Sequence, residues 1–185
     1  MKTLHIFIIL VLISNTILGQ QYNLINKKTS ISWTGKAAFN AYSLTGSLKA
    51  KSGFIKLQND SIIKLEVEID MKSLDHKNSN LKNHLRNKDF FEVKKYKTAR
   101  FKLISPVIIK NNKAVLIGEM SIKSTTKKEE IKIELIKKDN LLIKLTTIID
   151  RTEYDVKFNS PSVFKKMKEN AIADEFILEC KLVFN

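Results

Sequence analysis

The side chains that could carry out chemistry in this chain of 185 residues are few, and they do not form a recognisable catalytic set. The three histidines are His5, His76 and His84, and neither an HExxH run nor paired cysteines accompany them. Two histidines eight residues apart on a polar segment lack the spacing of a zinc site, so we interpret both as helix-surface residues. Five glycines stand singly, without a phosphate-binding loop or a GxSxG nucleophile elbow.

The densest charged group is Asp150, Arg151, Glu153 and Asp155, on a loop that is expected to follow a strand. Paired carboxylates can act in acid–base catalysis, but the neighbouring cations favour a salt-bridged loop instead. The single cysteine, Cys180, cannot form an intramolecular disulfide, and its place in an alternating apolar run predicts a buried thiol. The residues therefore predict a protein that is not an enzyme and that holds no metal.

Aromatic side chains, by contrast, are frequent at the expected strand ends and helix boundaries. Most of them, taken singly, are expected to fill the core, but together they could surround the mouth of a cavity for an apolar chain. Burying such a chain gains about 0.8 kcal/mol per methylene group before the costs of association. These residues are Trp33, Phe39, Tyr42, Phe90, Phe91, Tyr96, Phe101, Tyr154, Phe158 and Phe164.

The elements that must position these residues are strands, because apolar and polar residues alternate from Ile31 to Phe184. Residues 63–71 show this alternation most clearly. Residues 75–87 break it with polar residues at helical spacing, and Ser160-Pro161 has the pattern of a helix start. Turns are expected at Gly53, Asn59-Asp60, Asn111-Asn112, 124–128 and Asp139-Asn140.

Eight or nine short strands without a linker, repeat or low-complexity tract predict one all-β domain. Closure into a barrel removes the exposed edges that long isoleucine-rich strands would otherwise present. We therefore expect an eight-stranded antiparallel barrel with a short helical insertion in mid-chain and another before the last strand. Its interior is either packed solid or holds one elongated ligand.

The first 19 residues have the pattern of a secretory signal peptide. Lys2 gives the positive start, residues 4–13 are almost wholly apolar, and Gly19 offers a small residue for cleavage before Gln20. The apolar run is shorter than the roughly 20 residues that span a bilayer, which favours a cleaved signal over an anchor. A mature domain of residues 20–185, periplasmic or secreted, is expected.

The net charge of +14 does not have the distribution of a nucleic-acid-binding surface. Lysines are spread along nearly every expected strand, and the only arginines are Arg86, Arg100 and Arg151. Nucleic-acid readers concentrate their charge and supply arginine or stacking aromatics. The charge is expected to give solubility, or weak attraction to anionic membrane surfaces, and no binding of nucleic acid.

Five segments resemble the YceI-like family of bacterial lipid-binding barrels, in that family's order, across residues 30–184. The chain departs from the family pattern at Ser43, near the place of a usual histidine, and at Asp155, where a glycine is usual. Ser124 and Lys97 also replace a usual glycine and proline. The segments that carry the resemblance are Ser30–Lys36, Ile69–Leu74, Asn83–Phe101, Gly118–Lys123 with Thr126-Lys127, and Asp150–Tyr154.

The resemblance implies a lipocalin-like barrel that binds a polyisoprenoid or another long-chain amphiphilic lipid without catalysis, for transport or storage. It implies no cofactor other than a bound isoprenoid or fatty-acyl lipid. An apolar bore would hold the tail and a polar rim the head group. The expected bore residues are Trp33, Leu65, Val67, Ile69, Leu81, Leu85, Phe90, Phe101 and Phe158, and the expected rim residues are His84, Arg100 and Arg151.

Two hypotheses stay open at this stage. The first is a periplasmic carrier of a lipid or quinone precursor. The second is a packed barrel without internal ligand, whose basic outer face binds a partner protein or a membrane surface. An enzyme would require His84 to lie beside a carboxylate inside a cleft. The sequence does not decide between a monomer and a homodimer.

Overall fold

The computed structural model describes residues 19–39, 42–164 and 171–185 of the chain. In these ranges strands account for most of the chain, with one α-helix and two short 3-10 helices. The elements are β1 Gln20–Asn23, η1 Asn26–Lys28, β2 Ser30–Ala37, β3 Ser43–Gln58, β4 Ser61–Asp75, α1 Ser79–Arg86, β5 Thr98–Leu103, β6 Val107–Ile108, β7 Lys113–Ile122, β8 Thr125–Lys137, β9 Leu141–Asp150, η2 Arg151–Tyr154 and β10 Ile172–Phe184.

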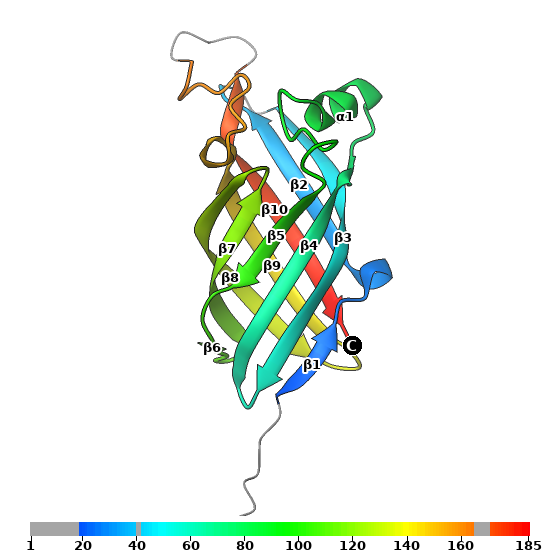
Figure 1. Ribbon diagram of the computed structural model, residues 1–185, viewed down its shortest axis with the longest axis vertical. Helices are drawn as coiled ribbons and strands as arrows, with labels where there is room; N and C mark the ends of the chain where they lie inside the picture. The colour runs from blue at the N-terminus through cyan, green and yellow to red at the C-terminus, as the bar shows by residue number, and fades with distance from the viewer. Residues whose placement is uncertain (1–18, 40–41, 165–170) are drawn as a thin grey trace, which may run out of the picture.

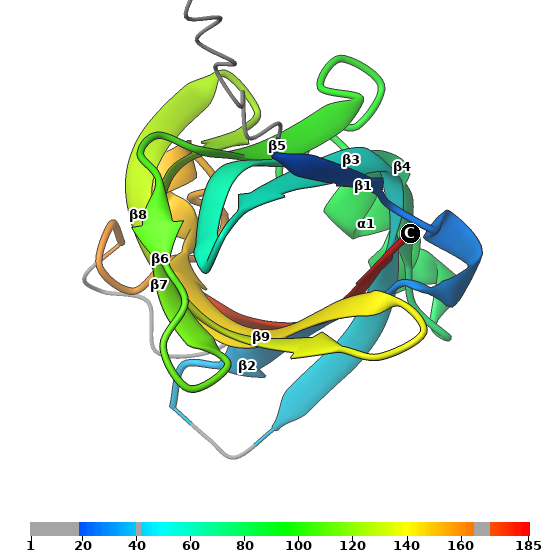
Figure 2. The ribbon, with the colours of Figure 1, turned by 90° about the horizontal axis from the view of Figure 1, so that it is seen from below.

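Eight of the strands form a closed antiparallel barrel, which confirms the predicted fold class (Figures 1 and 2). The strands follow one another in the order β3-β2-β10-β9-β8-β7-β5-β4, and the pairing of β4 with β3 closes the ring. Closure leaves the long apolar strands without free edges along most of their length. The inward side chains of all eight strands therefore face one shared interior.

The N-terminal segment completes the wall of the barrel below the start of β2. Strand β1 pairs with the second half of β3, where Tyr22 lies opposite Ile55. On its other side, Asn23 and Asn185 exchange two backbone hydrogen bonds of 2.7 and 3.0 Å. Strand β1 thus bridges β3 and the end of β10, and Gln20, the expected first residue of the mature chain, is its first residue.

The two ends of the barrel differ. The upper end in Figure 1 carries the β2–β3 connection, α1 with the loop that follows it, and the connection that contains η2. The lower end carries the β3–β4 and β8–β9 turns and the C-terminus. Buried side chains fill this lower end and close it, among them Ile55, Leu57, Ile62, Leu135, Leu141 and Phe184.

Most predicted turns are present, but the turn at Gly53 is wrong. Residue Gly53 lies inside β3 opposite Val67, near a register shift between Ala50 and Ser52. A Cβ atom at Gly53 would come within 2.8 Å of the carbonyl oxygen of Glu66, so the glycine permits close approach of two strands rather than a turn. The turn expected at residues 124–128 is tighter than predicted, because β8 already begins at Thr125.

Asparagines form two of the hairpin turns. Asn111 and Asn112 both adopt positive φ angles, 50° and 61°, as a two-residue type I′ turn requires. Asn59 does the same at the β3–β4 turn, with φ of 52°. Asparagine tolerates this left-handed conformation better than most residues, so the asparagine-based turn signals in the sequence had a sound physical basis.

The helical insertion in mid-chain is present as α1. The side chain of Asn78 caps it by accepting hydrogen bonds from the backbone amides of Asn80 and Leu81, at 3.0 and 3.1 Å. Before the last strand, the structure forms η2 and, from Ser160 to Phe164, a turn. The remainder of the helix expected from Ser160, including Met167, lies outside the described residues.

Candidate functional site

A cavity of about 170 Å³ runs inside the barrel and receives side chains from all eight of its strands. On β4 alone its lining includes Leu65, Val67, Ile69 and Met71, which are successive inward positions. Six residues of strand correspond to a length of about 20 Å, so the cavity is elongated along the wall. We call this cavity the bore.

The lining of the bore is apolar over almost its whole length. Among the described residues, Thr147, Arg151 and Glu175 are the only lining residues with a hydroxyl or charged side chain, and Arg151 and Glu175 lie near the upper end. At its lower part Ile131, Ile143 and Leu182 line it. Below that level the buried side chains of the lower end close the barrel, so the bore ends blindly there.

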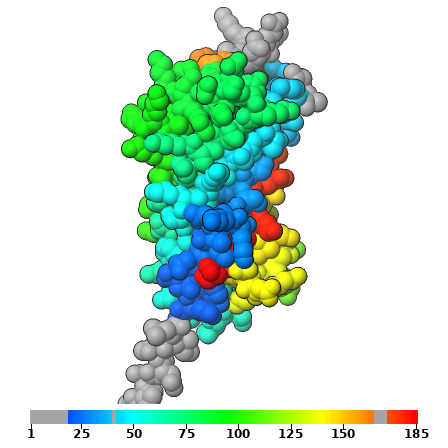
Figure 3. All heavy atoms as spheres, turned by 90° about the vertical axis from the view of Figure 1, so that its right-hand side faces the viewer, coloured from blue at the N-terminus to red at the C-terminus, as the bar shows by residue number. Residues whose placement is uncertain are grey.

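Helix α1 and the loop that follows it cover part of the upper end (green in Figure 3). Leu85 is the helix residue that is buried, and it lines the bore. The Nε atom of Arg86 donates to the carbonyl oxygen of Leu74 at 2.7 Å, which ties the helix to the end of β4. The amide of Phe91 donates back to the carbonyl oxygen of Leu85 at 3.2 Å, so the loop folds under the helix.

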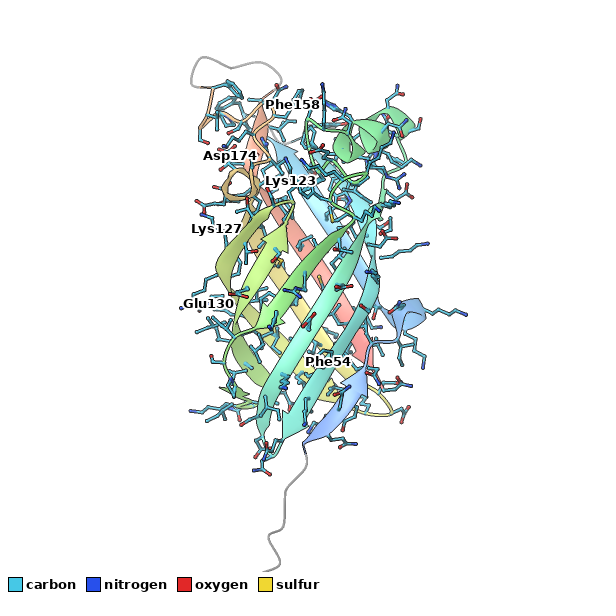
Figure 4. All side chains as sticks on the ribbon, viewed as in Figure 1. Phe54, Lys123, Lys127, Glu130, Phe158 and Asp174 are labelled. Atoms are coloured by element: carbon cyan, nitrogen blue, oxygen red, sulfur yellow. The ribbon has the colours of Figure 1, made fainter. Side chains whose placement is uncertain are left out.

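An aromatic cluster around Phe90 forms the underside of this cover. The Phe90 ring lies 5.1 Å from the ring of His84 and 5.2 Å from that of Phe158, which Figure 4 labels at the upper end. The His84 and Phe158 rings meet edge-on at 4.7 Å. Edge-to-face and tilted contacts at these distances are favourable, so rings from two distant segments of the chain hold the cover together.

Arg151 lies at the upper end of the bore beside this cluster, and its guanidinium group is hydrogen-bonded to the protein's own backbone. Three of its nitrogen atoms donate to the carbonyl oxygens of Ala173, Val156 and Ile172, at 3.0, 2.6 and 2.8 Å. A fourth interaction is the ion pair with Asp174 at 3.7 Å. Burial lowers the pKa of Arg151, and the nearby carboxylates oppose that effect. Its geometry is therefore that of a structural anchor for η2 and β10.

A second cavity, of about 330 Å³, adjoins the bore at the upper end between α1 and the β2–β3 connection. It shares Trp33, Gly35, Leu85, Phe90 and Ile172 with the bore, so the two spaces meet at these residues. We call it the portal. Its outer lining includes Lys36, Phe39, Tyr42, Leu44 and Leu81.

Trp33 lies at the junction of bore and portal, and its indole N–H is an unsatisfied hydrogen-bond donor. Its side chain is 9% exposed, and its Nε1 atom is buried without a hydrogen-bond partner among the described residues. Its ring lies 5.9 Å from that of His76. His76 was expected on a helix surface, and this was wrong: it is 6% exposed and precedes α1, with its Nδ1 accepting from the amide of Asn78.

The structure brings most of the sequence-predicted bore and rim residues to one place. Leu81 lines the portal, while His84 and Phe158 pack against Phe90 outside the lining. Arg100 lies on the outer face of β5, where it pairs with Glu66 at 3.5 Å, away from both cavities. The eight that line the bore are Trp33, Leu65, Val67, Ile69, Leu85, Phe90, Phe101 and Arg151.

The contribution of the last two strands to the bore was not predicted from the sequence. Leu145 of β9 and Phe176, Leu178 and Cys180 of β10 line it. The alternation in the last strand places these β10 residues on one face. It does not show whether that face points into the barrel or toward solvent. Burial raises the pKa of the Cys180 thiol to about 12.

The charged loop is salt-bridged as predicted, with one cation from β8 and one from the loop itself. Glu153 pairs with Lys127 at 2.7 Å and Asp155 with Lys157 at 2.9 Å. Over the described ranges, no three histidine, cysteine, aspartate or glutamate side chains are placed to share a metal ion. In the same ranges no helix has the length and apolar character needed to cross a bilayer.

Solved structures share this fold at low sequence identity. The structure of Burkholderia cenocepacia BcnA covers 86% of this chain and 98% of its own, with TM-score 0.72 and 18% identity. A Saccharophagus degradans domain, described as a polyisoprenoid binding domain implicated in plant cell wall breakdown, covers 89% and 97%, with TM-score 0.68 and 11% identity. The Campylobacter jejuni YceI protein covers 98% and 92%, with TM-score 0.53 and 20% identity.

In sequence, no curated protein matches the chain. The family model of the YceI-like domain matches residues 22–184, which reach from β1 to the end of β10. The match includes the strands that line the bore, the helix that covers it and the loop that holds Arg151. The chain therefore belongs to the YceI-like domain family.

Proposed function

We propose that this protein binds the apolar chain of a polyisoprenoid or similar long-chain amphiphilic lipid in its bore, without catalysis. The observation that carries the proposal is the almost wholly apolar lining from the Phe90 cluster down to Leu182. A lipid tail placed there leaves water at about 0.8 kcal/mol per methylene group. The structural likeness to a domain described as polyisoprenoid binding supports this class of ligand.

The head group would lie at the junction of bore and portal. The unpartnered Nε1 donor of Trp33 is buried there, and a buried donor without a partner carries a free-energy cost of about 1–3 kcal/mol. A ligand with a neutral oxygen acceptor near its polar end would supply the missing partner. Arg151 would not serve as the head-group ligand, because its donors are held by the protein.

The proposal includes a compartment and a role. With cleavage before Gln20, the barrel would act in the periplasm or outside the cell, where it would shield a lipid tail during transport or storage. The alternative, a packed barrel that works only through its basic outer face, is disfavoured by the open bore. Intact-mass measurement of exported protein tests the cleavage site, and a mature chain starting away from Gln20 would contradict it.

Trp33 is the single tryptophan of the chain and provides a direct assay. A brominated fatty acid bound in the bore would bring its bromine atoms near the indole ring and quench its fluorescence. The variant Cys180→Phe fills the bore with an aromatic ring and is expected to weaken this quenching titration about tenfold or more.

The matched control is Ile177→Phe. Ile177 lies on the same strand opposite Ile148, whose exposed fraction of 57% marks this as the outer face. This variant should titrate as the original protein does, within about twofold. Equal weakening of both variants, or no saturable quenching in the unaltered protein, would contradict binding in the bore.

A further inference from the structure

The exposed aromatic side chains of the described residues all lie at the upper end of the barrel. Phe39 and Tyr42 flank the tip of the β2–β3 connection and have exposed fractions of 65% and 62%. Val163 and Phe164, in the connection before β10, have exposed fractions of 44% and 47%. Large exposed apolar side chains gathered in one region mark a contact surface.

Backbone pairing keeps these two connections next to each other. The last residue of β2, Ala37, pairs with Ile172, and the amide of Ala38 donates to the carbonyl oxygen of Ala171 at 2.9 Å. The segment before β10 is joined to this pairing, since the amide of Ile172 donates to the carbonyl oxygen of Asn159 at 2.9 Å and the amide of Phe164 to that of Ser160 at 2.9 Å. The exposed side chains therefore belong to one anchored rim, which we call the apolar rim: Phe39, Tyr42, Val163 and Phe164.

The cover at the same end of the barrel is basic. Residues 76–97, which form the cover over the bore, contain seven lysines and arginines against two acidic residues, a net charge of +5. Lys36 adds a further cation in the lining of the portal. Cations near an anionic bilayer surface each add attraction, and exposed aromatic rings insert well at the level of the lipid head groups.

We propose that the upper end of the barrel docks on an anionic lipid bilayer. In this orientation the apolar rim is inserted among the lipid head groups, and the basic residues 76–97 face the membrane surface. Charge complementarity selects this partner over a neutral one, because the apolar side chains and the excess of cations share one end. Docking in this orientation places the portal against the bilayer, so that a lipid passes between membrane and bore without crossing water. The docking surface goes beyond the proposed ligand binding and does not require an occupied bore.

Vesicle flotation with phosphatidylglycerol–phosphatidylcholine mixtures, compared with pure phosphatidylcholine, tests the docking surface. At low salt the protein is expected to partition to the anionic vesicles about tenfold more strongly, and about 0.5 M salt should remove most of that preference. The double variant Phe39→Ser/Phe164→Ser is expected to reduce partitioning about tenfold.

The control variant is Ile108→Ser/Ile148→Ser, which removes two apolar side chains of similar exposure, 61% and 57%, from the lower end and the barrel wall. It should partition as the original protein does. Equal losses in both variants, or no preference for anionic vesicles, would overturn the proposal. Concentration-dependent dimerisation that only the rim variant abolishes would also overturn it, because a second copy would then occupy the rim.

The variant Cys180→Phe separates this inference from the proposed ligand binding. Filling the bore should weaken lipid uptake about tenfold or more and leave vesicle partitioning unchanged. A loss of partitioning in this variant would show that the bound lipid, and not the apolar rim, drives the association. Folding of each variant is checked by its cooperative urea transition.

Discussion

Gly46 determines where the indole ring of Trp33 can lie. The two residues pair directly between β2 and β3. A Cβ atom at Gly46 would collide with the Trp33 ring and with the carbonyl oxygen of Asp75. The absence of a side chain at this position therefore lets the ring rest on the strand, at the junction of bore and portal.

Substitution Gly46→Ala is expected to lower the free energy of unfolding by about 1–3 kcal/mol, because the ring and the backbone must move apart. Urea denaturation followed by Trp33 fluorescence measures the effect. The matched variant is Gly35→Ala, whose added carbon would meet only the Cζ3 atom of Trp33 at 3.9 Å, an ordinary contact. Equal destabilisation by both variants would contradict this account of Gly46.

The Cys180 thiol provides a second test at the scale of single residues. Burial raises its pKa to about 12, whereas an exposed cysteine titrates near 8.5. The thiolate is the reactive species, so at pH 8 the folded protein should react with a thiol reagent about a thousandfold more slowly than the urea-unfolded chain. Comparable rates in both states would show that the thiol does not lie in the apolar bore.

At the scale of elements, η2 and the start of β10 depend on Arg151. The variant Arg151→Lys leaves buried carbonyl oxygens without donors and is expected to destabilise the protein by about 2–4 kcal/mol in urea denaturation. The comparison is Arg100→Lys, whose exposed ion pair with Glu66 predicts a change below about 0.5 kcal/mol. If the two variants had similar stability, Arg151 would not be the anchor of this end of the barrel.

Asp174 gives this anchor a dependence on pH. Burial alone would raise the pKa of its carboxyl, but hydrogen bonds from Ser160 and Ser162 and the charge of Arg151 outweigh burial and lower it. Because the folded pKa lies below the unfolded value of about 3.9, the unfolded state binds more protons as the pH falls. The contribution of Asp174 is therefore complete at neutral pH and is lost below about pH 4.

The variant Asp174→Asn should be less stable than the original protein at pH 7, and the difference should shrink as the pH falls through the folded pKa. Thermal or urea unfolding measured between neutral pH and about pH 3 gives both curves. A gap that stays constant over this range would contradict the assigned role of the carboxylate.

The sequence alone predicted the elements that depend on residues close together in the chain. It did not predict the features that depend on contacts between paired strands of the barrel. Alternation identified the strands, and residue pairs that contain asparagine identified hairpins, because both depend on neighbouring residues. Gly53 was misread as a turn residue, since the need for a glycine there arises from β4, the strand paired with it. Arg100 was expected at the rim for a related reason: alternation groups Arg100 apart from Phe101, but does not say which face is the interior.

At the scale of the whole molecule, the barrel is asymmetric along its axis. Its lower end is packed with buried side chains, while the upper end combines the aromatic cover, the portal and the apolar rim. A lipid would consequently enter from above with its tail pointing down the bore. Strand β1 contributes to this asymmetry because it seals the wall between β3 and the end of β10.

Mass spectrometry of the organic extract from purified protein tests the occupancy of the bore most directly. Lipid binding in the bore predicts one reproducible isoprenoid or fatty-acyl species at up to about one molecule per barrel. The Cys180→Phe protein should lack this species, and the Ile177→Phe protein should keep it. Binding of a lipid in the bore would be contradicted if the unaltered protein gave a lipid-free extract and also failed to take up any lipid offered to it.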